Sequence, residues 1–477
     1  MTDSGEDASG DHEGQRHVAH RRQEPELFPE GRRDGQARCL VLTQPEAPTR
    51  LLRAIRRWDL VALVLNFIVG AGIFGLPSRV HALAGDYSLL AYVACAIPVF
   101  LIILCFAEVS SRFDQTGGLY LYGRATFGPF VGFEIGWLAW LARLTGFAAL
   151  CNLFADYLGL FLPVSAPGPA RATAVAVVVV GLTVVNLRGV RQASIFNNIF
   201  TLGKLLPLLL LVVGGSFFID PARYSAAGPP EYSGFSAAVL LLLFAFTGFE
   251  NAVIPAGEVR DPRRDLPFAL LTGTAITTVL YIAIQAVSIG VVPDLASSER
   301  PLADVGARLL GRYGAAFIAV GALVSILGTL NGVLLAGSRL LFAMGEQGDL
   351  PPLFVRTHAR FRTPHVAIVI TAIGVVLLTV TGSFLSLVRL STVIRLVTYA
   401  VTCAAVPMLR RRAGRPAAFS VPGGDLVAAV ALALIAWLFS SSSAADALLV
   451  LAAAGVALLF YLATRGRWRP PEAQGIA

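Results

Sequence analysis

Apolar stretches of about 18 to 25 residues recur along this chain from Leu60 nearly to the C-terminus. Each stretch is long enough for a helix to cross about 30 Å of hydrocarbon. The composition agrees, because 56% of the 477 residues are hydrophobic and only 14% are charged, against about a quarter in soluble domains. No soluble core needs so much apolar surface, so the sequence predicts an all-α membrane protein.

About twelve transmembrane helices account for these stretches. We place them near residues 60–83, 88–110, 129–159, 171–187, 196–214, 236–258, 267–291, 313–343, 366–381, 385–406, 425–440 and 445–463. Arginine clusters fall in alternate connections, with the loop around residues 300–312 as the main exception, and basic side chains are retained on the cytoplasmic side. The pattern predicts a multi-pass protein of the cell (inner) membrane with both termini in the cytoplasm.

Several functional classes are disfavoured by the sequence. Residues 1–49 are polar and mixed in charge and lack a signal-peptide core, so we expect a disordered cytoplasmic tail. The formal net charge of +8 does not indicate nucleic-acid binding, because the basic residues cluster at the ends of apolar runs. The five cysteines lack CxxC or metal-ligand spacing, and no phosphate-binding loop or nucleophile elbow is present. We therefore expect neither an enzyme nor a metal or cofactor site.

Two apolar stretches contain helix-weakening residues in their middle. The first reads LVLNFIVGAGIFGLPSRV and the sixth reads LLLFAFTGFENAVIPAGEV. Irregular backbone at membrane depth is tolerated only where it lines a cavity or is buried in protein. Ordinary kinks are the alternative, since Gly and Pro are common in membrane helices. If five spans form a repeat, the sixth helix corresponds to the first in inverted orientation, and such paired breaks indicate a transporter's central site.

The two breaks offer complementary backbone groups. The second half of the first helix starts near Gly72, where free N–H groups and the positive end of a helix dipole suit a carboxylate. The first half of the sixth helix ends near Ala245 and Phe246, where free carbonyls suit an ammonium group, aided by carbonyls near Ile68. The small residues Gly70, Ala71 and Gly72 allow a ligand to approach the backbone closely. Together the breaks predict a site for the two charged groups shared by all α-amino acids.

Several motifs carry a resemblance to a known family. NFIVGAGIFGLP resembles the first-helix signature of the amino acid-polyamine-organocation (APC) superfamily, and FAFTGFENAVIPAGEVRDPRRDLP resembles its sixth helix and following loop. The resemblance covers roughly residues 59–412. It implies a LeuT-type fold in which residues 50–214 and 215–409 form two inverted five-helix repeats, and residues 410–477 add two helices and a short tail.

The resemblance also implies roles for individual residues. In such families the substrate carboxylate is bound by helix-one backbone that matches Ala71 and Gly72 here. The amine is bound by carbonyls that match Ile68, Phe244 and Thr247, and the ring of Phe244 matches an aromatic group that covers the substrate.

Charged residues inside the apolar stretches are the remaining candidates. Lys204, the single lysine of the chain, lies in the fifth stretch, where an ionisable group is costly and is by default a functional candidate. The resemblance implies that its ammonium replaces the sodium ion of sodium-coupled relatives; snorkelling to an interface is the alternative. Glu250 is either a proton-coupling carboxylate or a hydrogen-bonding cap. Mutual ion pairs are the expectation for four further charged residues, which are Glu134, Arg143, Asp156 and Arg395.

These features predict a secondary active transporter that moves amino acids by alternating access, either coupled to protons or as an exchanger. Its partners are the amino acid, the lipid bilayer and, in a symporter, protons. A carrier of polyamines or other organic cations is one alternative, although such substrates lack the carboxylate. A transporter-like sensor that binds an amino acid without moving it is the other.

Overall fold

The structure is a computed structural model. It describes residues 55–70, 72–113, 118–164, 166–188, 193–224, 231–253, 259–412, 417–464 and 467, with the side chains of residues 193–202 excluded. The expected tail at residues 1–49 and the candidate Ala71 lie outside the described residues.

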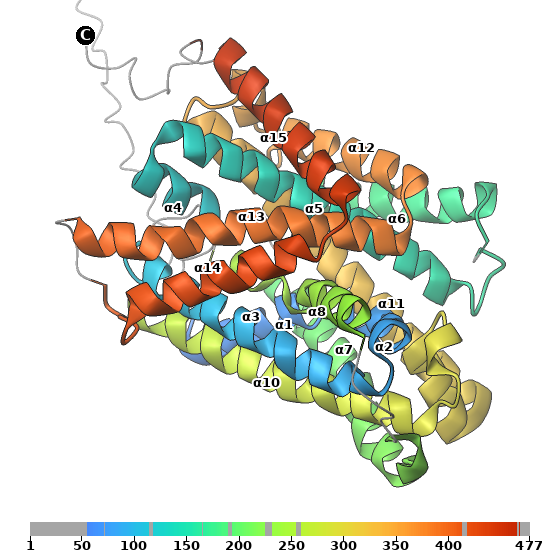
Figure 1. Ribbon diagram of the computed structural model, residues 1–477. Helices are drawn as coiled ribbons and strands as arrows, with labels where there is room; N and C mark the ends of the chain where they lie inside the picture. The colour runs from blue at the N-terminus through green and yellow to red at the C-terminus, as the bar shows by residue number, and fades with distance from the viewer. Residues whose placement is uncertain are drawn as a thin grey trace, which may run out of the picture. The chain divides into compact units, whose positions relative to one another are not determined.

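The described chain folds into helices, some joined by single 3-10 turns, and its one β-bridge pairs Ile55 with Val259. Figure 1 shows how the helices pack along one another. They are α1 (Arg57–Ile68), α2 (Gly72–Ala84), α3 (Ser88–Ser110), α4 (Gly118–Phe127), α5 (Pro129–Leu158), α6 (Pro169–Arg188), α7 (Ala193–Gly215), α8 (Tyr232–Phe246), α9 (Phe249–Ala252), α10 (Pro262–Val291), α11 (Pro301–Glu346), α12 (His365–Thr381), α13 (Phe384–Arg411), α14 (Gly424–Ser440) and α15 (Ala444–Thr464).

Each predicted apolar stretch is occupied by helix in the described chain. Eight helical segments are long and apolar enough to cross a membrane, and three shorter apolar helices accompany them, at Gly203–Phe218, His365–Thr381 and Gly424–Ser440. The chain is therefore a multi-pass membrane protein. Outward-facing valines and leucines of α6 and α15 are exposed, which suits contact with hydrocarbon.

Two features of the helices were not predicted. Helix α4 was missed because its ten residues are too short for a transmembrane stretch. It is fixed by polar contacts instead, since Tyr120 and Arg124 donate to Asp349 over 2.5 and 2.6 Å. Burial and the neighbouring Asp349 carboxylate raise the pKa of Tyr120. Helix α11 also begins earlier than predicted, and Gly311, with φ of 58°, marks a kink inside it.

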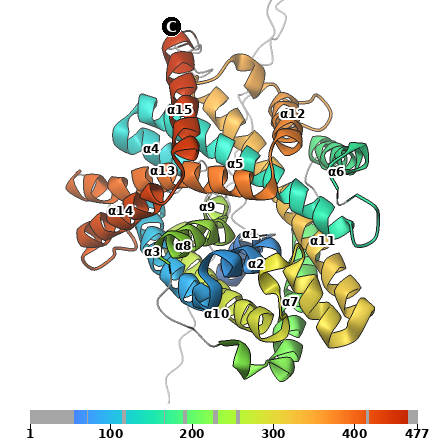
Figure 2. The ribbon, with the colours of Figure 1, turned by 45° about the vertical axis from the view of Figure 1, so that its right-hand side comes forward.

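The broken segments occupy the middle of the helix assembly. Helix α5 packs against α4, α11, α12 and α13, whereas α10 packs against α1 and α3. Figure 2 shows α1, α2 and α8 between α5 and α13 on one side and α10 on the other. Because α2 and α8 also contact each other, the first and the sixth apolar stretches meet inside the protein.

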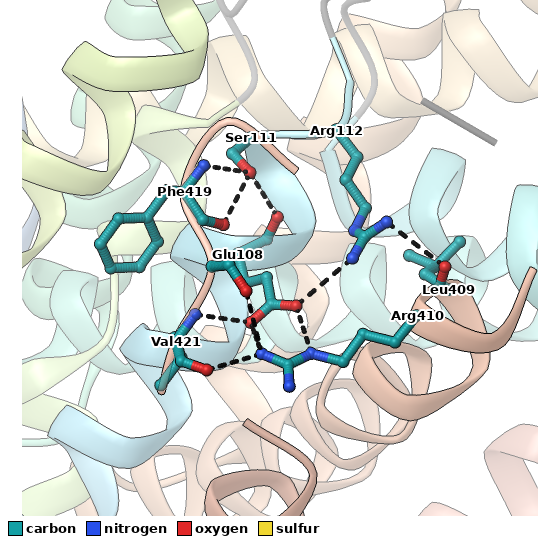
Figure 3. Close-up of polar contacts among 8 residues, drawn as sticks. Glu108, Ser111, Arg112, Leu409, Arg410, Phe419 and Val421 are labelled. Atoms are coloured by element: carbon teal, nitrogen blue, oxygen red, sulfur yellow. Dashed lines mark hydrogen bonds and ion pairs between the residues drawn. The ribbon is translucent and has the colours of Figure 1, made fainter. Parts of the chain in front are cut away.

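A buried carboxylate ties the end of α3 to the end of α13 (Figure 3). Glu108 is fully buried and accepts two hydrogen bonds of 2.7 Å from Arg410, one of 3.4 Å from Arg112 and one of 3.0 Å from the Val421 amide. Arg410 also donates to the Val421 carbonyl at 2.6 Å. The two-pronged arginine–carboxylate geometry is the strongest form of such a pair. It holds α3, α13 and the segment before α14 together.

We expect substitutions of the two partners, Arg410 and Glu108, to lower the stability of the protein by different amounts. Arg410→Met leaves the buried Glu108 charge poorly compensated, and we expect a loss of about 3–5 kcal/mol in stability. Glu108→Gln should cost less, because the Arg410 side chain is 23% exposed and reaches water. Thermal unfolding of the purified variants in detergent measures both losses of stability.

The exposed pair of Arg223 and Asp220 supplies the control. Arg223→Gln should change stability by less than about 1 kcal/mol. A melting temperature that is unchanged in Arg410→Met, or lowered equally by all three substitutions, would contradict this role of the buried pair.

Candidate functional site

The first helix is interrupted where its glycines predicted. Helix α1 ends at Ile68, and Val69 has φ −70° and ψ 69°, outside helical geometry. The Gly70 amide turns back to the Ile68 carbonyl at 2.6 Å, and the helix resumes as α2 at Gly72. The first N–H groups of a helix have no partner within it. The start of α2 therefore presents donors beside the break.

The second break lies in the sixth stretch. Helix α8 ends at Phe246, Thr247 is extended, and Gly248 has φ of 116°, a conformation that favours glycine. The Phe244 carbonyl accepts bonds from the Thr247 amide at 3.1 Å and hydroxyl at 2.8 Å. Thr247 thus satisfies a carbonyl at the end of its own helix.

The two breaks touch each other directly. A Cβ atom added at Gly248 would lie 2.3 Å from the Phe67 carbonyl oxygen. One added at Gly72 would lie 3.1 Å from the Ala245 Cα atom. Backbone approaches backbone at both points, so side chains are excluded from the contact.

Two polar side chains from other helices cap the broken ends. The Tyr281 hydroxyl of α10 lies 2.8 Å from the Ile68 carbonyl and 3.1 Å from the Ala245 carbonyl, and so bridges the ends of α1 and α8. Lys204 of α7 is fully buried and donates to the Asn66 carbonyl at 2.6 Å. Lys204 therefore does not snorkel outward. The sequence reasoning missed Tyr281, whose partners lie on two other helices.

Buried charges form a network beside the second break. Glu250 accepts from the Gly248 amide at 2.8 Å, from the Tyr399 hydroxyl at 2.9 Å and from Arg395. Glu250 thus caps α9 and also forms an ion pair. The expected mutual ion pairs do not form, because Arg395 pairs with Glu250 and Asp156 pairs with Arg171 at 2.7 Å, both partners outside the predicted set.

Arg143 and Glu134 do not follow that expectation. Arg143 donates to the Ala139 carbonyl at 2.8 Å and to the Asn251 side-chain oxygen at 3.0 Å. Within the described chain Arg143 forms no ion pair with a carboxylate, and Glu134 forms none with a basic side chain. The burial of Arg143 was predicted correctly, but the prediction of ion pairs was wrong for both residues.

A cavity of about 40 Å³ lies between the breaks and these buried charges. Every predicted substrate residue that the structure describes lines it. Those residues are Ile68, Gly70, Gly72, Phe244, Ala245 and Thr247, and they are joined by Phe67, Arg143, Gly146, Phe147, Leu150, Gly248, Asn251, Thr329, Val333 and Arg395. Glu250 adjoins the cavity through Arg395.

A second, larger cavity, of about 460 Å³, follows along α5. Leu150 lines the first cavity and Leu153 the second, one helical turn away. Gly75 of α2 sits between Leu153 and Phe384, and a Cβ added there would lie 2.8 and 3.0 Å from their side chains. These three residues pack tightly beside the point where the cavities approach each other.

The contact between the breaks predicts a strong effect at Gly248. Gly248→Ala places a Cβ against the Phe67 carbonyl and also strains a positive φ, so the breaks must separate. We expect a melting temperature several degrees lower and loss of substrate uptake. Gly181→Ala on α6 is the matched control, because a Cβ there meets open space. Equal melting temperatures and equal uptake in the two variants would mean that the breaks are not in contact.

Comparisons with known proteins agree with this architecture. A family model described as amino acid permease matches residues 55–468. The chain is 28% identical to the methylthioribose transporter of Bacillus subtilis over 411 residues, covering 82% of this chain and 88% of that protein. It is 27% identical to the branched-chain amino acid permease BcaP of the same organism, covering 80% and 86%. It is 30% identical to the serine/threonine exchanger SteT of that organism, covering 76% and 84%.

The family model spans most of the chain and includes both broken helices and every helix that lines the cavity. The relatives' names are those of transporters and permeases, so the chain is not an enzyme. The protein belongs to the amino acid permease family of the APC superfamily.

Proposed function

We propose that this protein is a secondary transporter that carries amino acids across the cytoplasmic membrane by alternating access. The observation that carries the proposal is the meeting of two interrupted helices at one buried cavity. One break presents the N-terminal end of α2, and the other presents the carbonyl end of α8. Such a pair of ends matches a carboxylate and an ammonium group.

The proposed topology has twelve spans and both termini in the cytoplasm. Residues 50–214 and 215–409 form two inverted five-helix repeats, and residues 410–477 add the last two helices. The breaks support this arrangement, because α1–α2 and α8–α9 are the first apolar stretch of each proposed half. Residues 1–49 form the cytoplasmic tail of the proposal.

The proposed substrate lies with its carboxylate at the backbone of Ala71 and Gly72, beside the small Gly70. Its ammonium approaches the carbonyls of Ile68, Phe244, Ala245 and Thr247. The Ala245 carbonyl accepts the Tyr281 hydroxyl and keeps a second lone pair for the ammonium. The Ile68 carbonyl already accepts from the Gly70 amide and the Tyr281 hydroxyl, and the Phe244 carbonyl accepts twice from Thr247. At these two carbonyls the ammonium is proposed to displace one of the existing bonds. The Phe244 ring borders the cavity and is placed to cover the ligand.

Lys204 and Glu250 are the proposed coupling residues. The Lys204 amine donates to a carbonyl at the broken end of α1. In the proposal its ammonium form takes the place of a sodium ion. Transport is therefore proposed to need no sodium. Glu250 is bonded to the backbone of one break and to Arg395 of α13, so its charge connects moving segments of the proposed cycle.

Uptake by purified protein in liposomes tests the function. We expect accumulation of labelled amino acids from a panel, equal in sodium and in potassium buffer. Accumulation driven by a pH gradient identifies a proton symporter, and uptake only with amino acid inside identifies an exchanger. Binding without flux would replace the carrier with a sensor, and uptake of polyamines alone would replace the amino acid with an organic cation.

Lys204 offers a sharper test of the coupling role. Lys204→Met keeps the length of the side chain but removes the donor to the Asn66 carbonyl. We expect the turnover rate to fall at least about tenfold, since a buried acceptor loses a charged partner. Size-exclusion profiles check that the variant is folded. Normal turnover with an unchanged pH profile would reduce Lys204 to a packing role.

A further inference from the structure

Two buried arginines form a cationic wall of the cavity beside the second break. Arg143 of α5 and Arg395 of α13 both line it, and they are 4% and 6% exposed. A Cβ added at Gly146, one turn along α5 from Arg143, would lie 3.6 Å from an Arg395 guanidinium nitrogen. The two guanidinium groups therefore share one side of the cavity.

These two arginines differ in their partners. Arg395 forms an ion pair with Glu250, which is itself 1% exposed. Arg143 has only neutral acceptors, the Ala139 carbonyl and the Asn251 amide oxygen, and its Nε atom has no hydrogen-bond partner. Within the described chain, one carboxylate thus faces two arginines at this wall, and the excess is one positive charge.

An uncompensated buried charge is costly in a low-dielectric interior. A zwitterionic amino acid with a neutral side chain brings no net charge, because its carboxylate and ammonium balance each other at the two breaks. It would leave the Arg143 charge uncompensated when the cavity closes around it. A substrate with a second carboxylate would supply the missing counter-charge.

Building on the transport of amino acids proposed above, we infer that the site selects acidic amino acids, with the side-chain carboxylate bound by Arg143. The Nε atom and its neighbouring Nη form a planar fork that matches a carboxylate. Cationic amino acids and polyamines would add a like charge beside two arginines and are rejected. Phe147, Leu150 and Val333 line the remaining space and contact the aliphatic part of the ligand.

A competition assay with the unmodified protein tests this selectivity. Uptake of labelled glutamate into liposomes is measured with excess unlabelled glutamate, aspartate, glutamine, serine or lysine. We expect glutamate and aspartate to compete at least tenfold more strongly than glutamine or serine, and lysine not to compete. If labelled glutamine and serine are carried while the acidic amino acids neither compete nor enter, the inference is overturned and the proposed transport stands. If no amino acid of any class is carried or bound, the proposed function itself fails.

Substitutions at Arg143 separate recognition from structure. Arg143→Gln should raise the KM for glutamate by about 10- to 100-fold, the effect of losing a charged hydrogen bond, and leave the KM for glutamine within about threefold. Arg143→Lys retains the charge without the planar fork and should show a smaller rise in the KM for glutamate. Arg308→Gln, at an exposed position of α11, is the control and should match the unmodified protein. An equal change for glutamate and glutamine in folded Arg143→Gln would assign Arg143 a structural role.

Discussion

Interrupting a helix inside an apolar assembly frees backbone groups that water cannot reach, and each unsatisfied group costs free energy. The centre of this protein depends on how those groups are satisfied. Tyr281 bridges the ends of α1 and α8, Lys204 takes the Asn66 carbonyl, and Glu250 takes the Gly248 amide. Tyr281 and Lys204, which are remote in sequence from the breaks, and Glu250, two residues after Gly248, thus satisfy these backbone groups where the helices stop.

The same contacts connect the breaks to the helices that surround them. Glu250 joins α9 to α13 through Arg395 and Tyr399, while Tyr281 joins α10 to both broken ends. A shift of the broken segments would therefore change hydrogen bonds on both sides of the cavity at once. Within a low-dielectric interior such networks favour discrete arrangements over gradual ones.

Helix ranges could be predicted because length and hydropathy are local properties of a membrane helix, and the breaks because glycine marks them. Contacts between distant segments could not. Arg395 and Glu250 are 145 residues apart, and nothing in their own neighbourhoods indicates that α13 passes beside α9. For Tyr281 the only signal was a polar group on an apolar helix, which does not identify its partners. The neutral surroundings of Arg143 could not be predicted either, because they also depend on contacts between distant segments.

The fully buried Lys204 has a practical consequence, because the sequence contains no other lysine. Apart from the terminal amine, an amine-directed reagent meets a single target in the whole chain. That target becomes accessible only when α7 and the broken end of α1 separate. The rate at which Lys204 is labelled therefore reports movement of α7 against α1 without any engineered label.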